Sequence, residues 1–372
     1  MKILHFYKTY LPDTIGGLEQ SINQIAQGTS KCGVDVEVLT LSPNVVDQVI
    51  KVDQHLVHQC RSNFEIASTP FSLSAFYRFR QLVDQADLVH YHFPYPFADV
   101  LHFITMVKKP TVVTYHSDIV KQKYALKLYR PLKHCFLNSV DHVVATSPNY
   151  LESSKVLSKI KQKVSVIPLG IDKATYPGAT EEKLKYWKER FGEKFFLFVG
   201  VIRYYKGLHI LVEAMKNSDF PVLIVGAGPI EKELKMHAEK SGTRNLYFLG
   251  FLSNEDKCAL LELCFAVLFP SHLRSEAFGI SLLEGAMYGK PLISSEIGTG
   301  TTYINIDKET GVVVPPSNPV ALREAMEFLW DNPDVASDMG KKANQRYWTL
   351  FTADRMAKSY VSLYEKLLSQ DK

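Results

Sequence analysis

The stretch FFLFVGVIRYYKGLHILVEAM, residues 195–215, contains a short apolar run, a glycine-bounded loop and a longer segment with helical character. An unbroken apolar run bounded by turn residues is typical of a strand buried on both faces of a parallel sheet. Arg203 and Lys206 lie in the loop between the run and the segment LHILVEAM. The stretch therefore predicts a strand–loop–helix unit with two cations where the strand ends.

The same alternation extends in both directions along the chain. Before this stretch the apolar runs are KILHFY, VDVEVLT, LVHYH, PTVVTYH and HVVATS, and after it they are PVLIVGAG, NLYFLG, FAVLFPS, KPLISS and GVVVPP. Strands that alternate with helices predict a parallel sheet wrapped by helices. The pattern restarts after VSVIPLGID (164–172) and the turn residues Pro177-Gly178. We therefore predict two α/β domains with a ligand site in the cleft between them.

Length and composition agree with this division. A chain of 372 residues exceeds the roughly 250–300 at which one core stops growing. The formal charge of +4 is too small to indicate nucleic-acid binding. Five scattered cysteines without a C-x-x-C pair, no signal-peptide core and no apolar run of about 18 residues favour a cytoplasmic protein. We expect that it at most lies on a membrane surface.

Three glycine-containing turns follow predicted strands. Gly16-Gly17 precedes a helix whose first amides could face an anion, although a flexible turn would have the same sequence. The cations of the 200–207 loop suit a diphosphate. The third turn, GAGP at 226–229, lacks the last glycine of the G-x-G-x-x-G fingerprint, which disfavours a nicotinamide dehydrogenase.

A fourth segment, EAFGISLLE at 276–284, has two carboxylates about two helical turns apart. Glu276 is expected in the loop before a helix and Glu284 inside it. The amides between them would be free to receive phosphate oxygens. Complementation of the helix dipole by a nearby carboxylate is the plain alternative.

These segments together resemble one enzyme family. PSHLRSEAFGISLLEGAMYGKPLISSEIGTG (270–300) resembles the donor-site signature of family 4 of the retaining GT-B glycosyltransferases. Gly16-Gly17 resembles its N-terminal glycine loop, TYHSD (114–118) its histidine motif and IPLGID (167–172) its hinge. Arg203 and Lys206 resemble its basic pair, although many relatives separate the two cations further.

The resemblance implies the GT-B fold, two Rossmann-like α/β domains whose parallel sheets face each other across a cleft. Residues 1–168 would form the acceptor-side domain, 169–178 the hinge and 179–345 the nucleotide-sugar domain. Residues 346–372 would form a terminal helix that returns to the first domain, anchored by Trp348 and Phe351.

The resemblance also implies roles for individual residues. Glu284 would bind the ribose, Glu276 the transferred sugar, and Arg203 with Lys206 the departing diphosphate. His116 would lie beside the sugar, with a buried strand-end histidine as the plain alternative. The remaining donor contacts would come from Gly16, Gly17, Phe251, Leu252, Ala277, Phe278, Gly279 and Ile280. Transfer would retain the anomeric configuration and need no metal or cofactor.

The resemblance also implies the class of the donor and of the acceptor. RYYKGLHILVEA is similar to bacterial mannosyltransferases of O-antigen and capsule synthesis, which implies GDP-mannose as donor, with UDP-hexoses next. The acceptor would be a polyprenyl-diphosphate-linked saccharide. A two-lobed sugar-binding protein is the non-enzymatic alternative. His90 and His92, two apart on one strand, form a metal-like pair, but we find no nearby Cys or Asp to complete a ligand set.

A basic segment follows the histidine motif. Residues 119–136 contain five cations and no acidic residue. On a helical wheel Lys123, Lys127, Arg130 and Lys133 cluster, opposite Val120, Tyr124, Leu128, Leu132 and Phe136. We expect this helix either to contact an anionic membrane or the acceptor diphosphate, or simply to pack on the first domain, with Pro131 kinking or splitting it.

Overall fold

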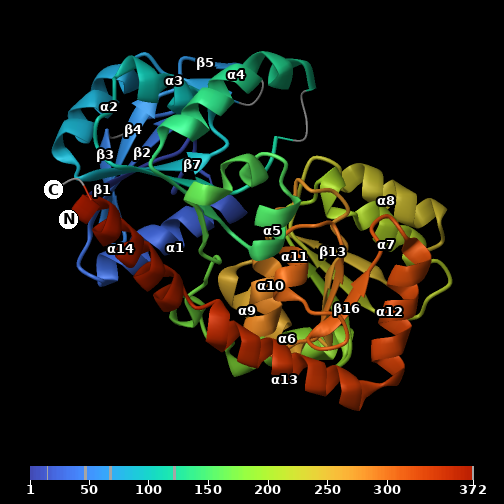
Figure 1. Cartoon of the computed structure of the whole chain (residues 1–372). Coiled ribbons are helices and arrows are strands. Elements are labelled where there is room, and N and C mark those ends of the chain that lie inside the picture. The colour runs from blue at the N-terminus through green and yellow to red at the C-terminus, as the bar shows by residue number, and fades with distance from the viewer. Residues whose placement is uncertain (15, 46–47, 67–68, 120–122, 371–372) are drawn as a thin grey trace. The chain divides into compact units, whose positions relative to one another are not determined.

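The computed structural model describes residues 1–14, 16–45, 48–66, 69–119 and 123–370. The chain divides into two compact units. The first unit comprises Met1–Gly170 and Ala353–Lys372, and the second comprises Ile171–Thr352. In each unit helices cover a mainly parallel sheet (Figure 1). The predicted fold class, two α/β domains with parallel sheets, is therefore confirmed.

The sheet of the first unit has the order β10-β9-β8-β7-β1-β2-β4-β3. Neighbouring strands are parallel except β3 and β4, which are antiparallel, and β5 pairs with β6 in a separate antiparallel hairpin. The strands are β1 (Lys2–Phe6), β2 (Asp35–Ser42), β3 (Val49–Val52), β4 (His55–Arg61), β5 (Phe64–Ile66), β6 (Thr69–Phe71), β7 (Leu88–Phe93), β8 (Thr111–Tyr115), β9 (His142–Ala145) and β10 (Val164–Val166).

The helices of the first unit include one from the C-terminal end of the chain. They are α1 (Gly17–Lys31), α2 (Ser74–Gln85), α3 (Pro96–Ile104), α4 (Lys123–Ser139), α5 (Pro148–Ser153), the 3₁₀ helix η1 (Leu157–Lys163) and α14 (Ala353–Gln370). The red α14 lies against the blue α1 in Figure 1. A Cβ added to Gly28 would lie 2.8 Å from the Cβ of Ala357, so glycine permits this close approach.

The sheet of the second unit has the order β13-β12-β11-β14-β15-β16, with neighbouring strands parallel. The strands are β11 (Phe196–Val199), β12 (Val222–Val225), β13 (Leu246–Gly250), β14 (Ala266–Phe269), β15 (Leu292–Ser295) and β16 (Gly311–Val314). The helices are η2 (Lys173–Thr175), α6 (Glu181–Phe191), η3 (Tyr204–Lys206), α7 (Leu208–Ala214), α8 (Glu231–Lys240), α9 (Asn254–Leu263), α10 (Ile280–Met287), α11 (Thr301–Ile304), α12 (Pro319–Asp331) and α13 (Pro333–Leu350).

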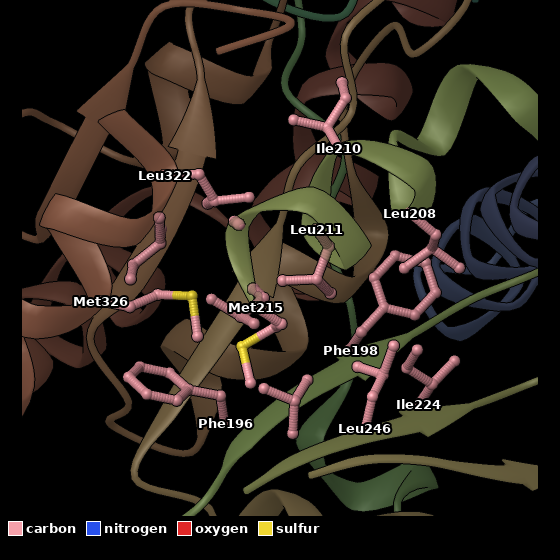
Figure 2. Packing of buried hydrophobic residues seen from close by; sticks show 14 of the residues in the cluster. Phe196, Phe198, Leu208, Ile210, Leu211, Met215, Ile224, Leu246, Leu322 and Met326 are labelled. Carbon is pink, nitrogen blue, oxygen red and sulfur yellow. The ribbon is translucent and has the colours of Figure 1, made fainter. Parts of the chain in front are cut away.

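The core of the second unit explains its unbroken apolar strands. Phe196 and Phe198 of β11 point from the sheet toward Leu211 and Met215 near the end of α7, with Met326 of α12 beside them (Figure 2). All five are less than 2% exposed. Because helices cover the sheet, its central strands bury both faces and have no polar alternation.

Both strand orders are doubly wound, and this arrangement determines where ligand sites can form. The order reverses between β11 and β14 in the second unit and between β1 and β7 in the first. Ligands of doubly wound sheets bind outside the carboxyl ends of the strands at such a reversal. The loops after these four strands are therefore the places to look for function.

The boundaries differ in detail from the expected ones. The units separate after Gly170, within IPLGID, and residues 346–352 cluster with the second unit. The C-terminal segment is two helices, because α13 ends at Leu350 and α14 begins at Ala353. Phe351 between them is fully buried, but Trp348 is 56% exposed and does not anchor the segment as expected. Within the described residues, no helix is both long enough and apolar enough to cross a membrane.

Candidate active site

The loops on either side of the reversal in the second unit bring two predicted residues together. Lys206 ends η3 after β11, and Glu276 lies in the loop after β14. Their side chains form an ion pair and are each only 12% exposed. The Lys206 ammonium also lies 4.7 Å from the ring centre of Phe269. Arg203, three residues earlier, is exposed, so this loop offers one paired and one solvent-facing cation.

Gly207 holds the two loops at this distance. Its φ of 74° lies in the left-handed region, and a Cβ at this position would be 1.9 Å from the carbonyl oxygen of Pro270. The amide of His272 also donates to the carbonyl of Tyr205 at 3.0 Å. The close contact therefore requires glycine and places Lys206 beside Glu276.

The backbone between the two carboxylates forms a row of free donors. Gly279, with φ of 105°, precedes the first residue of α10, Ile280. In the described parts of the chain, no group accepts a hydrogen bond from the amides of residues 277–280. The carbonyl of Ala277 accepts from the amide of Gly300 at 2.8 Å, which anchors the loop. Such amides at a helix N-terminus suit phosphate or sugar oxygens.

Glu284 is the second carboxylate, and its environment fixes one of its oxygens. Glu284 is 3% exposed, and its Oε1 accepts from Lys257 Nζ at 2.8 Å and from Tyr176 Oη at 3.0 Å. Burial, followed by the charge of Glu284, raises the pKa of Tyr176 well above its usual value, so its hydroxyl remains a donor. Among the described residues Oε2 has no partner and is available to a diol. Sequence inspection missed Lys257 and Tyr176.

The loops at the other strand ends of this sheet have further predicted residues. Gly250, with φ of 71°, ends β13, and Phe251 after it is 79% exposed, while Leu252 is half-buried. Gly226 and Gly228 follow β12, and no larger residue fits at either position, because a Cβ would lie 2.1 Å from a carbonyl oxygen of the loop after β11. Phe251 thus presents an open aromatic face at the carboxyl edge of the sheet.

The first unit places its predicted residues at the carboxyl edge of its own sheet. Gly16 and Gly17 cap and begin α1, and a Cβ at Gly17 would meet no atom within 4 Å. His116 follows β8 and is 5% exposed, and its Nε2 lies 3.0 Å from His92 Nδ1. Burial lowers the pKa of His116 to about 3, so its ring is neutral at physiological pH. Its burial leaves both a binding role and a packing role open.

Helix α4 differs from the expected amphipathic helix. It continues through Pro131, and Leu128, expected to pack, is 87% exposed. Lys127 and Arg130 are exposed, but Lys133 is half-buried near Asp99, and burial lowers its pKa. On the packed side Tyr129 donates to the buried Asp99. Residues 120–122 of the predicted segment lie outside the described residues, as do the side chains of 123–126.

Comparisons with known proteins cover nearly the whole chain. Residues 15–175 match the glycosyltransferase family 4 model and residues 180–346 the model of the glycosyl transferases group 1. D-rhamnosyltransferase WbpZ of Pseudomonas aeruginosa is 57% identical over 353 residues, which are 95% of this chain and 93% of the relative. O-antigen chain mannosyltransferase C of Escherichia coli is 50% identical over 368 residues, 99% of each chain.

Solved structures with low sequence identity share the fold. Sucrose-phosphate synthase from Thermosynechococcus elongatus has a TM-score of 0.80 at 20% identity and covers 99% of each chain. Anabaena HepE, solved with UDP-glucose, has a TM-score of 0.77 at 18% identity, over 98% of this chain and 100% of the other.

The doubly wound sheets and these matches define a glycosyltransferase of the GT-B class. The chain belongs to the group 1 glycosyltransferases, with a family 4 glycosyltransferase domain in its N-terminal half. The resemblance inferred from the sequence motifs is confirmed, and the individual site roles stay predictions.

Proposed function

We propose that the protein transfers a hexose from a nucleoside-diphosphate sugar to a polyprenyl-diphosphate-linked saccharide during O-antigen synthesis, with GDP-mannose as donor. The names of the two relatives above, an O-antigen mannosyltransferase and a D-rhamnosyltransferase, support this class of acceptor and a manno-configured sugar. D-rhamnose is the 6-deoxy form of D-mannose, so the two candidate sugars differ only at carbon 6.

One observation carries the proposal. The loop and helix after β14 provide the free amides of residues 277–280 and the carboxylate of Glu284, of which only Oε1 has partners. The neighbouring loop after β11 adds Lys206, which is paired with Glu276. The diphosphate would accept hydrogen bonds from the amides of residues 277–280 and from Arg203 and Lys206. Glu284 would receive the ribose hydroxyls on Oε2. Phe251 would stack on the base.

The same groups account for the chemistry. Breaking the anomeric bond moves negative charge onto the diphosphate while the sugar gains oxocarbenium character. Fixed donors aimed at the developing charge lower the barrier without a metal ion. We propose that Arg203 and Lys206 supply this stabilisation, that Glu276 and His116 contact the sugar, and that transfer proceeds with retention. The departing phosphate would take the acceptor's proton.

A thermal-shift screen followed by an assay of nucleotide release tests the donor. A donor at a hundredfold excess over its Kd stabilises by about 2.7 kcal/mol, which is a readily measured shift. We expect GDP-mannose to shift the unfolding temperature and to release GDP in the presence of lipid-linked acceptor. A response to GDP-rhamnose alone would move the assignment to the deoxy sugar, and a response to UDP-hexoses alone would refute a GDP donor.

The same assay separates the remaining alternatives. Binding without nucleotide release, with acceptor present, would favour a sugar-binding protein. Unchanged activity in EDTA is expected for the metal-independent reaction. The product's anomeric proton coupling, compared with that of the α-linked donor, tests retention.

We also propose that α4 contacts an anionic membrane. Lys127 and Arg130 flank the exposed Leu128, and cations beside an apolar side chain suit a lipid interface. Each cation near such a surface contributes about 1 kcal/mol. The parent protein should sediment with anionic but not neutral liposomes, and less so as salt rises.

Substitution of α4 tests this contact. Lys127→Ser with Leu128→Ser and Arg130→Ser should abolish sedimentation and leave nucleotide binding intact. The control is Lys232→Ser with Lys240→Ser, which removes two exposed cations of α8 in the other unit. Sedimentation of the α4 variant at the parent's level would refute the contact.

A further inference from the structure

Three buried histidines in the first unit form one hydrogen-bonded row that ends at His116. His116 Nε2 lies 3.0 Å from His92 Nδ1, and His92 Nε2 lies 2.9 Å from His5 Nδ1. The ring centres are 5.2 Å apart in both pairs and the ring planes are inclined by 29° and 16°, so neighbouring rings meet edge to edge through their nitrogens. At the inner end His5 Nε2 is buried and has no hydrogen-bond partner among the described residues.

The strands explain why the row forms. His5 of β1 is in register with His90 of β7, so His5, His90 and His92 lie on one face of the sheet. His92 pairs in turn with Thr114 of β8, two residues before His116. His90 belongs to a separate arrangement, because its nitrogens contact Tyr364 Oη and Thr114 Oγ1, each at 2.7 Å.

Hydrogen bonding explains this cluster better than metal binding. Ligand atoms of His5, His90 and His92 lie within 4.8 Å of one another, which completes the pair noted in the sequence. Both nitrogens of His90 nevertheless already have oxygen partners. The rings of His5 and His92 also meet edge to edge and aim their facing nitrogens at each other, whereas metal ligands converge on a common point.

Each ring in the row has one proton. Burial lowers the pKa of His5 and of His116 to about 3 and that of His92 well below its usual value. A neutral imidazole has one N–H and one acceptor nitrogen. Because His92 uses both nitrogens within the row, its tautomer determines which nitrogen of each neighbour is protonated, and only two arrangements of the row exist.

The inner end selects between the two arrangements. In one, His5 Nε2 holds a buried proton without an acceptor, and His116 exposes a bare Nδ1. In the other, His5 Nε2 is bare, each ring donates toward His116, and His116 Nδ1 has the free proton. Backbone groups in protein interiors show that a buried N–H without an acceptor is rarer than a buried acceptor without a donor. The second arrangement is therefore favoured.

We propose that His92 and His5 are positioning residues that fix the tautomer of His116, so that His116 Nδ1 presents an N–H to a hydroxyl of the transferred sugar. The contact with sugar rests on the proposed function. The existence of the row and its tautomer do not. In the described residues Nδ1 of His116 has no protein partner, so it is available for this role.

Nitrogen-15 NMR of histidine-labelled protein tests the tautomer without any substrate, because protonated and bare ring nitrogens resonate far apart. The parent should show His116 protonated on Nδ1 and bare on Nε2. His92→Phe keeps a ring but removes both hydrogen bonds, and it should give a mixture of the two tautomers. His92→Gln, which can both donate and accept, should restore the parent pattern. His90→Phe is the matched control, equally buried on the same strand but outside the row.

Kinetics then test the consequence for transfer. With donor and acceptor present, His92→Phe should lower kcat about tenfold, as loss of an outer partner does for other oriented histidines. KM for the donor should change less than about threefold if the contact strengthens in the transition state. His92→Gln should recover most of kcat, and His90→Phe should leave it near the parent's.

The outcomes separate this proposal from the proposed function. An unchanged His116 spectrum in His92→Phe would overturn the row whatever the activity. A parent protonated on Nε2 would overturn the proposed tautomer. A changed spectrum with unchanged kcat would overturn the role of the tautomer in transfer. A parent without transferase activity on any nucleotide sugar would overturn the proposed function and leave the NMR result to decide the row.

Discussion

Tyr176→Phe is the most informative single change in the second unit. Tyr176 and Lys257 both donate to Oε1 of the buried Glu284 and leave Oε2 for the proposed contact with the ribose. The variant removes one hydroxyl and keeps the ring. We therefore expect weaker donor binding while the fold is preserved. Tyr176 lies 108 positions from Glu284 in the sequence, so only the folded structure shows this contact.

The size of the effect follows from the contacts. A hydrogen bond to a charged group contributes about 1.5–3 kcal/mol net. Because Lys257 still holds the same oxygen, the lower end applies, and about 1.4 kcal/mol corresponds to tenfold in Kd. Donor Kd should therefore rise about tenfold. The kcat value should change little, because ribose contacts are equally strong before and during the reaction.

Isothermal titration with the preferred nucleoside diphosphate, together with initial rates, measures both quantities. Tyr186→Phe is the matched control, because Tyr186 lies half-exposed on α6 and contacts Arg190 instead. In a Glu284→Ala background Tyr176→Phe should have no further effect on Kd. The reasoning is refuted if Tyr176→Phe weakens binding equally with and without the Glu284 carboxylate, since Tyr176 would then act by another route.

Three further predictions concern other parts of the molecule. Arg203→Ala should lower kcat by about 10²–10³ with unchanged circular dichroism, because one preorganised donor to the developing charge is lost; retained kcat would make the exposed guanidinium a surface group. Phe251→Ala should raise donor Kd about tenfold, since stacking on a base contributes about 1–3 kcal/mol, and titration with the nucleotide would show no change if the base lies elsewhere. Stability should fall as pH drops below about 6.5, the usual histidine pKa: burial lowers the pKa of His5 and His116 to about 3, so the unfolded chain binds more protons between these values. Denaturant titrations at pH 7 and pH 5 would contradict this if they gave equal free energies of unfolding.

Local sequence was sufficient for the architecture. Parallel strands buried on both faces produce unbroken apolar runs such as Phe195–Val199, and glycines bound the loops after them. Gly207 was visible as a loop end, but its reason, the contact with the Pro270 carbonyl, depends on the pairing of two strands that lie 70 positions apart. Sequence thus predicted which loops follow the strands beside the reversal, but not what holds each loop in place.

Residues that act through tertiary contacts had no local signal. Lys257 lies on an ordinary helix, and nothing around Tyr176 indicates a partner in α10. Strand alternation placed His90 and His92 on one face, but the addition of His5 requires the register of β1 with β7. Helix α4 formed with Phe136 buried as expected, but the wheel did not predict that Leu128 would be exposed or that Tyr129 would bind Asp99.

In the proposed reaction the Lys206–Glu276 pair would link the two parts of the donor that separate during transfer. Glu276 is proposed to contact the sugar and Lys206 the diphosphate, yet the two side chains are already paired and mostly buried. As the anomeric bond breaks, negative charge would grow on the diphosphate. Lys206 would then strengthen its contact there, because Glu276 would simultaneously face a sugar that is becoming positive. The carboxylate would then stabilise the sugar as the ammonium stabilises the phosphate, and neither charge needs to be desolvated again during transfer. Loss of Glu276 would for this reason affect both halves of the donor. Loss of Glu284, whose partners are Lys257 and Tyr176, would affect only the proposed ribose contact.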